Sequence, residues 1–430
     1  MKLIYRFSLL CCLHLASHSV QAQTQSEVQP EVQSSTYPTW LPPAVQVKNT
    51  LENLPQLRAS RANLIAEKAN AERLRVGPHE WIARATGQQR RERIGTNYYE
   101  NEIAIERAIR YSGKADKDIA IGKNSIEVAD AALADNWHEA ARSLMALWFN
   151  WLREERQTRR LQEYAQVLQR ELQIAEKRVK AGDAPRMEIM LAETELAKAQ
   201  SAQMQAARRT ELLAAELEKR FPSIALHAST TLAEPPDVAG SLALWREKIL
   251  TDNHELELAE RTAQNEKLIA ERILLEKTPD PTIGVRMVQE RGGSEKILGL
   301  SLSMPLPGEY RRRQAEVALA RADVAQERAQ ETRVKVEAMA NQVSITALSA
   351  KSLWQTMATI STQTETNARL ASRAYELGEA SLAETLLARR HAIEALNQAE
   401  LAQLDALEAY SRLLLDTHAI WSLHEGHEHY

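Results

Sequence analysis

The stretch EYRRRQAEVALARADVAQERAQETRVKVEAMANQVSITALSAKSLWQTMATISTQTETNARLASRAYEL, residues 309–377, contains neither glycine nor proline. As a single helix its 69 residues would span about 100 Å, at ~1.5 Å per residue. Helices of globular proteins average about 12 residues, so a helix of this length cannot fold back inside a domain. It needs partners along its whole length, and the stretch therefore predicts a fold built on very long, paired helices.

Other long stretches without glycine or proline surround this one in a repeated order of short, long, short. They are residues 56–76, 123–181, 186–221, 241–278 and 379–425. In each half of the chain, the two short stretches together roughly match the long one in length. This order predicts that each long helix is paired with two shorter helices stacked end to end.

Within residues 309–377, small and apolar residues recur at alternating spacings of three and four, which is the period of a coiled coil. The series is Ala315, Ala318, Ala322, Ala325, Ala329, Thr332, Val336, Met339, Val343, Thr346, Ala350, Leu353, Met357 and Ile360. Small residues fill its first part, where helix axes can approach closely. We expect this series to form the buried seam of the helix.

The composition agrees with a mainly helical chain. Glycine and proline number 14 each in 430 residues, and aromatic residues make up 5%, which argues against a doubly wound α/β enzyme. The net charge of -4 implies no strongly basic surface and thus no nucleic-acid partner. No nucleophile elbow, phosphate-binding loop, dinucleotide motif or His-Glu-x2-His pattern occurs. We therefore predict no catalytic residues, no cofactor and no enzymatic activity.

The N-terminus has the pattern of an export signal. Residues 1–22 begin with the positive charges of Lys2 and Arg6, continue with an apolar run and end in small residues suited to cleavage. Both cysteines of the chain lie within this segment, and neither follows a small residue, which argues against a lipid anchor. Residues 23–43, rich in Gln, Ser, Pro and Val, are expected to be an extended leader.

The remainder reads as an internal duplication. AGDAPRMEIMLA at 181–192 aligns with LGEASLAETLLA at 377–388, an offset of 196 residues. We expect a first repeat over 44–222, a linker over 223–240, a second repeat over 241–423 and a histidine-rich tail over 424–430. Repeats of this kind complete their core by stacking on copies of themselves.

Each repeat also contains a predicted strand hairpin between its first short helix and its long helix. In the second repeat, apolar residues alternate with polar or small ones from Ile283 to Met304 around a Gly-Gly turn at 291–294. In the first repeat, alternation is clear over 99–110 and weaker over 81–93. Four strands cannot close a membrane barrel, so strands that meet lipid would require an oligomer, with three chains supplying twelve. The alternative is a small soluble sheet that caps a helical bundle.

With these features the chain, from about residue 41 to 423, resembles the outer-membrane efflux (TolC) family. The helical turns carry the most specific motif of that family, which looks like Arg-x3-Gly-x2-Ser/Pro-x2-acid-x-Leu-x-Ala. The first turn matches with Arg178, Gly182, Pro185, Glu188 and Ala192, although Met190 replaces the Leu. The second matches with Gly378, Ser381, Glu384, Leu386 and Ala388, and Arg373 lies one residue too far from the glycine.

Two further segments narrow the resemblance. TPDPTIGV at 278–285 and SMPLPG at 303–308 are most similar to the heavy-metal (cobalt-zinc-cadmium type) efflux branch. The resemblance implies a homotrimer, with a twelve-stranded β-barrel in the outer membrane continued by a twelve-helix α-barrel in the periplasm. It also implies the exit duct of a tripartite pump, with outer-membrane lipid, a periplasmic adaptor and an inner-membrane proton-driven transporter as partners, and heavy-metal cations as cargo. The alternatives are a duct for organic compounds and a soluble periplasmic adaptor or scaffold.

The resemblance and the turn chemistry together select candidate functional residues. The predicted adaptor contacts are Arg178, Gly182, Pro185, Arg373, Gly378 and Ser381; the alternative is that they only cap helices. Glu188 and Glu384 are predicted to ring a tunnel constriction, or else to be solvated acids at helix starts. His424, His427 and His429 are predicted to attract metal weakly, whereas the other eight histidines are dispersed without ligand spacing.

Overall fold

The computed structural model describes residues 37–228 and 231–423. The chain divides at Pro38, and the described helices and strands belong to the part from Thr39 onward. The first half contains α1 (Ala44–Glu52), α2 (Pro55–Val76), β1 (Ile82–Arg91), β2 (Asn97–Ala108), α3 (Lys114–Ala181) and α4 (Met187–Arg220). The second half repeats this order with α5 (Leu242–Thr251), α6 (His254–Leu275), β3 (Thr282–Glu290), β4 (Glu295–Ser303), α7 (Glu309–Glu376) and α8 (Leu382–Asp416).

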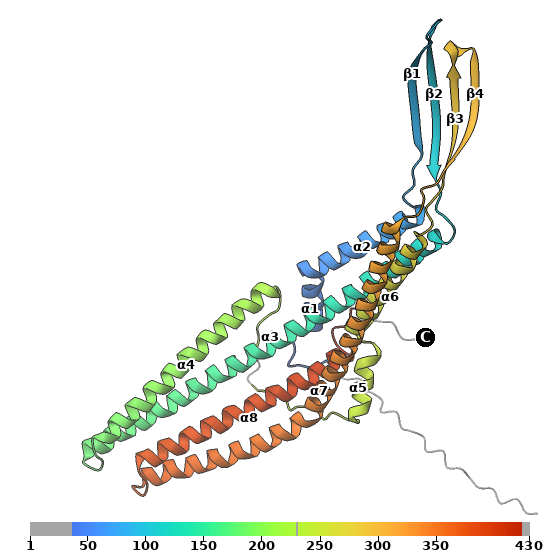
Figure 1. Cartoon of the computed structure of the whole chain (residues 1–430). Helices are drawn as coiled ribbons and strands as arrows, with labels where there is room; N and C mark the ends of the chain where they lie inside the picture. The colour runs from blue at the N-terminus through green and yellow to red at the C-terminus, as the bar shows by residue number, and fades with distance from the viewer. Residues whose placement is uncertain (1–36, 229–230, 424–430) are drawn as a thin grey trace, which may run out of the picture. The chain divides into compact units, whose positions relative to one another are not determined.

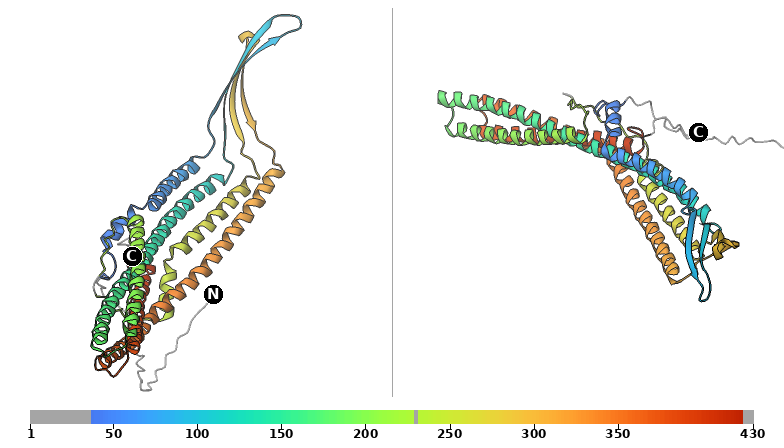
Figure 2. Two further views of the ribbon diagram at one scale, coloured as in Figure 1. Left: turned by 90° about the vertical axis from the view of Figure 1, so that its left-hand side faces the viewer. Right: turned by 90° about the horizontal axis from the view of Figure 1, so that it is seen from above.

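The two long helices, α3 and α7, organise the packing. Near the strands, α2, α3, α6 and α7 lie side by side in that order, as Figure 2 shows. Beyond the middle of the long helices, α4 packs on α3, α8 packs on α7, and α3 contacts α8 (Figure 1). The expected pairing of each long helix with shorter helices end to end is therefore confirmed.

One predicted helix is interrupted. The stretch 241–278 forms α5 and α6, which are separated at Asp252 and Asn253, because the Asn253 side chain accepts a hydrogen bond from the Leu256 amide and so starts a new helix. In the stretch 379–425, the helix α8 ends at Asp416, before the end of the stretch. Glycine and proline were the only breakers considered in the prediction, and side-chain capping by Asn is the breaker that it missed.

The predicted seam of α7 is correct only over its first part. Ala315, Ala318, Ala329 and Val336 are buried, but Leu353 is 54% exposed. After Val336 the buried positions are Ala340, Ser344, Ala347, Ser361, Ala368, Ser372 and Tyr375. A straight α-helix drifts by about 20° per heptad from a strict seven-residue repeat. In addition, α7 changes partner along its length from α6 to α5 and α8.

Aromatic residues occur at the middle of α3 and small residues where helices approach closely. Phe149 and Trp148 are buried, and the Trp148 indole donates to the Trp40 carbonyl, which ties the start of the described chain to α3.

At Gly122 of α3, a Cβ atom would lie only 2.9 Å from the Cα atom of Ala71 in α2. The α2–α3 contact therefore requires glycine at that position.

The four strands form one antiparallel sheet in the order β1-β2-β3-β4. Both predicted hairpins are confirmed, and β2 pairs with β3 to join the two halves of the chain. The predicted turn between β3 and β4 is a single 3₁₀ turn at Arg291–Gly293, in which Gly292 and Gly293 have positive φ angles. Within the described ranges, no helix has the length and apolarity needed to cross a membrane.

Candidate functional site

The sheet has one apolar and one charged face. Across its strands, Ala83, Ile105, Val285 and Leu300 form one row, and Ile105, Val285 and Leu300 are at least 48% exposed. The row formed by Ala85, Ile103, Met287 and Leu298 lies on the same face. Side chains on the opposite face include Arg84, Arg90, Glu100, Glu102, Glu106, Arg286 and Glu290. The rows nearer the helices thus expose large aliphatic side chains, a surface suited to lipid or to a partner, whereas the row of Gly87, Asn101, Gln289 and Lys296 on the same face is polar.

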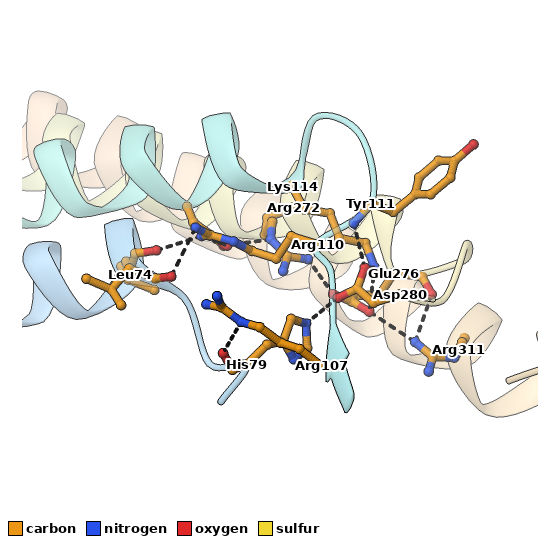
Figure 3. Close-up of polar contacts among 12 residues, drawn as sticks. Leu74, His79, Arg107, Arg110, Tyr111, Lys114, Arg272, Glu276, Asp280 and Arg311 are labelled. Atoms are coloured by element: carbon orange, nitrogen blue, oxygen red, sulfur yellow. Dashed lines mark hydrogen bonds and ion pairs between the residues drawn. The ribbon is translucent and has the colours of Figure 1, made fainter. Parts of the chain in front are cut away.

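A polar network joins the sheet to the helices, and Figure 3 shows its centre. The Lys114 side chain is fully buried, and its Nζ atom donates to Asp280 Oδ1 at 2.7 Å and to Glu276 Oε2 at 3.1 Å. Asp280 also accepts from the Tyr111 amide and lies 2.8 Å from His79 Nε2. Burial by itself would raise the pKa of Asp280, but the hydrogen bonds from Lys114, Tyr111 and His79 outweigh it and hold the pKa at about 2.

The same network closes the end of α2. Arg110 donates to the Leu74 carbonyl oxygen (Figure 3) and to that of Arg75, neither of which has a partner within the helix. It also donates to Asp118 Oδ2 at 3.0 Å. Arg272 of α6 bonds to the other oxygen of Asp118. Residues from α2, α3, α6 and the segment between β2 and α3 are thereby held together where the strands leave the helices.

At the opposite ends of the long helices, two turns reverse the chain. Gly182 and Gly378 have φ angles of 87° and 81°, the left-handed conformation expected of glycine after a helix. Ser381 and Glu384 form a capping box at the start of α8: Ser381 accepts from the Glu384 amide, and Glu384 accepts from the Ser381 amide. The glycine helix stop is therefore present in both turns, whereas a side-chain cap at the start of the next helix is present at α8 and absent at α4.

Tyr375 links the two helical hairpins close to these turns. Its side chain is fully buried, and its hydroxyl donates to Glu188 Oε2 of α4 at 2.7 Å. Arg178 of α3 lies over the Tyr375 ring, with 4.5 Å between its guanidinium carbon and the ring centroid, and donates to the Tyr375 carbonyl at 3.0 Å. Burial and the bond to Glu188 raise the pKa of Tyr375 to about 12, so the hydroxyl keeps its proton at neutral pH.

An apolar cluster supports this link. It joins residues of all four helices near the turns: Leu168, Leu172, Ala175, Ala192, Leu196, Ala199, Tyr375, Leu382 and Leu386. Arg389 of α8 also lies 3.7 Å from the buried carboxylate of Glu171 in α3. Separating the two hairpins would expose this cluster and break the contacts of Tyr375.

The predicted site residues differ in their exposure and in their contacts within the chain. Gly182, Pro185, Gly378 and Ser381 are exposed in the turns. Arg373 is exposed and pairs only with Glu376, one turn along its own helix, among the described residues. By contrast, Arg178 is half-buried and engaged with Tyr375. The predicted constriction residues Glu188 and Glu384 both accept hydrogen bonds within the chain, and His424, His427 and His429 lie outside the described residues.

Three histidines that are dispersed in the sequence converge in the structure. His138 of α3, His254 at the start of α6 and His418 after α8 have ring centroids 4.7 to 6.2 Å apart. His138 donates to Asp416 at 3.0 Å. Their wide separation in the sequence hides this contact, because the helices that carry them meet only in the folded chain. Nevertheless, in residues 37–228 and 231–423 no group of three or more His, Cys, Asp or Glu side chains is arranged to hold a metal ion.

Burial keeps His138 of this cluster neutral. Burial by itself would raise the pKa of Asp416, but the hydrogen bond from His138 and the charges of Arg412 and Arg142 hold it at about 2. Burial lowers the pKa of His138, against the effect of its bond to Asp416. The joint between α3, α6 and the end of α8 therefore contains a neutral imidazole beside an ionised carboxylate.

Comparison with known proteins identifies the fold. No protein-family model and no curated protein matches the chain. Among solved structures, the CmeC outer membrane channel of Campylobacter jejuni aligns with a TM-score of 0.73 at 12% identity, covering 89% of this chain and 86% of that one. The outer membrane protein VceC of Vibrio cholerae aligns with a TM-score of 0.71 at 16% identity, covering 89% and 99%.

A third similar structure is the open state of the MtrE outer membrane channel of Neisseria gonorrhoeae. It aligns with a TM-score of 0.65 at 15% identity, covering 87% of this chain and 88% of that one. Each alignment includes most of both chains, so the similarity extends over the strands and the long helices together. The chain thus has the fold of solved outer membrane channels.

Proposed function

We propose that this chain is the outer-membrane exit duct of a tripartite efflux pump. The observation that carries the proposal is the sheet with one exposed apolar face and one charged face, attached to helices that continue far beyond it. In a membrane barrel, strands alternate between lipid-facing apolar residues and lumen-facing polar ones. The apolar face would contact lipid and the charged face would line the water-filled passage.

The duct would be a homotrimer. Within the described residues, β1 and β4 each have one edge without a partner strand, and a sheet in lipid cannot keep open edges. Three chains would pair these edges into a twelve-stranded barrel, continued by twelve helices. Exposed apolar residues on α7, such as Val334, Ile345 and Leu353, support a neighbour along that helix.

The turns at Gly182 and Gly378 would form the periplasmic end, where the adaptor binds. Exposed Arg373, Pro185 and Ser381 are the residues we assign to adaptor contact, together with Arg178. Glu188 and Glu384 would ring the constriction there, and the Tyr375–Glu188 bond would help to hold it closed. The open state determined for MtrE is consistent with an end that can move.

The assembly is tested first, by membrane fractionation. A duct should be found in the outer-membrane fraction as a trimer that resists heat in mild detergent. A protein that is recovered without detergent as a soluble species would instead be a periplasmic adaptor or scaffold, and the duct would be rejected.

The cargo is tested separately. We propose heavy-metal cations, on the resemblance at 278–285 and 303–308, with organic compounds as the alternative. Deletion strains grown on graded zinc, cobalt, cadmium and copper, with dyes and detergents alongside, distinguish the two. Sensitivity to metals alone supports the metal pump, and sensitivity to dyes or detergents alone keeps the duct but assigns it to organic compounds.

A further inference from the structure

Three charged residues of the strands lie on the apolar face of the sheet: Arg91 and Lys296 at the end far from the helices, and Arg107 at the near end. Arg107 of β2 is the partner of Ile283, which is the partner of Leu302, so its side chain belongs to the same face as Ile105 and Val285. It lies at the end of the sheet nearest to the helices. Beside the aliphatic rows at this end of the face, the charge of Arg107 is costly in lipid unless it reaches the polar boundary or a ligand of opposite charge.

The guanidinium of Arg107 is only partly occupied. Its Nε atom donates to the His79 carbonyl at 3.0 Å, and its central carbon lies 5.5 Å from the centroid of the Trp81 ring. In Figure 3 the single dashed line from Arg107 ends on His79. Among the described residues no carboxylate pairs with Arg107, whereas its neighbour Arg110 is neutralised by Asp118. The Arg107 guanidinium therefore carries an unbalanced positive charge with donors to spare.

A groove of about 530 Å³ lies beside this guanidinium. Its lining combines Arg107 and Trp81 with aliphatic side chains, among them Val76, Ile105 and Val285. Trp81 is 67% exposed and Val76 is 63% exposed. The groove is thus cationic and aromatic at the helix end and aliphatic along the strands. This distribution matches a molecule with a phosphate at one end and a hydrocarbon chain at the other, because Arg binds phosphate and Trp prefers the membrane–water boundary.

We propose that Arg107 and Trp81 bind the phosphate of a glycerophospholipid whose acyl chain lies along Ile105 and Val285. The proposal rests on the proposed function, since it needs the apolar face in a membrane, and it names the lipid contact of that membrane. The site would fix the depth of the sheet at the boundary nearest the helices. Arg84 is a matched arginine on the charged face, where it pairs with Glu106 at 2.7 Å.

The test is native mass spectrometry of the full-length protein in detergent, titrated with phosphatidylglycerol. Wild type should bind about one lipid per chain tightly. R107Q should weaken that binding at least fivefold, and R84Q should change it less than twofold. W81A, which alters an exposed side chain, should weaken binding at least threefold and serves if R107Q does not assemble. Equal binding by wild type, R107Q and W81A would overturn the site.

Two competitors and one localisation check separate the remaining outcomes. Inorganic phosphate should not displace the lipid; displacement would mean an anion site only and would overturn the lipid assignment. Preference for lipid A over phosphatidylglycerol would also overturn it. Wild type and each variant are fractionated in parallel. If R107Q and W81A reach the outer membrane and bind lipid as wild type does, this site alone is rejected. If wild type is absent from the outer-membrane fraction, the proposed duct is rejected.

Discussion

Replacing Tyr375 with Phe isolates one contact between the two helical hairpins. The substitution keeps the buried ring and its contact with Arg178, and removes only the hydroxyl that donates to Glu188 at 2.7 Å. A hydrogen bond to a charged group contributes ~1.5–3 kcal/mol. Glu188 is half-buried, so water replaces part of the loss, and we expect about 1.4 kcal/mol per chain, which is about tenfold in an equilibrium constant. If three chains open together, the shift reaches roughly 1000-fold.

Conductance of single channels in planar bilayers measures this shift. Y375F should spend at least ten times longer in its open state than wild type. Tyr164 offers a matched control, since it borders the same apolar cluster and its buried hydroxyl has no hydrogen-bond partner among the described residues. Y164F should therefore open no more than wild type. An equal, low open probability for wild type, Y164F and properly assembled Y375F would refute the idea that this bond holds the end closed.

Three further predictions concern the helices. K114M should destabilise the protein to urea by about 3–5 kcal/mol, because it removes a fully buried lysine from two partly buried carboxylates. K117M breaks a half-exposed pair with Glu271 and should cost under ~1 kcal/mol. Equal effects of the two substitutions would contradict the importance of the buried lysine. The pKa of His138 in the folded protein lies below the unfolded value of about 6.5, so its contribution to stability is full above that pH and is lost as the pH falls below it. H138Q should flatten this dependence of stability on pH, measured by urea unfolding at pH 7.5 and 5.5. An unchanged difference in stability between the two pH values would contradict the importance of His138. G182A should cost about 1 kcal/mol in thermal unfolding from its positive φ angle alone, because no atom lies within 4 Å of the new Cβ. The control G308A also has no atom within 4 Å of its new Cβ, but its φ angle is negative, so it should be neutral. Similar costs for the two substitutions would mean that backbone strain is not the cause.

Much of the architecture was predictable because its signals are local. The absence of glycine and proline over 309–377 identified α7 almost to the residue, and the glycines at 182 and 378 marked the reversals. Alternation of apolar residues with a Gly-Gly turn located β3 and β4. The break before α6 was missed because it depends on a single side chain, that of Asn253, which accepts a backbone hydrogen bond. One Asn among strong helix formers gives only a weak signal of a helix boundary in the sequence.

The contacts between distant segments were decided by the tertiary structure. Tyr375 and Glu188 are 187 residues apart, and His138 and Asp416 are 278 apart, so no spacing in the sequence relates them. The place of Arg107 on the apolar face also depends on its pairing with Ile283 in the other half of the chain. The sequence by itself determined which segments are helices and strands, because hydrogen bonding and side-chain periodicity act over a few residues. The tertiary structure decided which side chains meet. The pairing of β2 with β3, and the drift of the buried face along each long helix, determine which residues of distant segments come into contact.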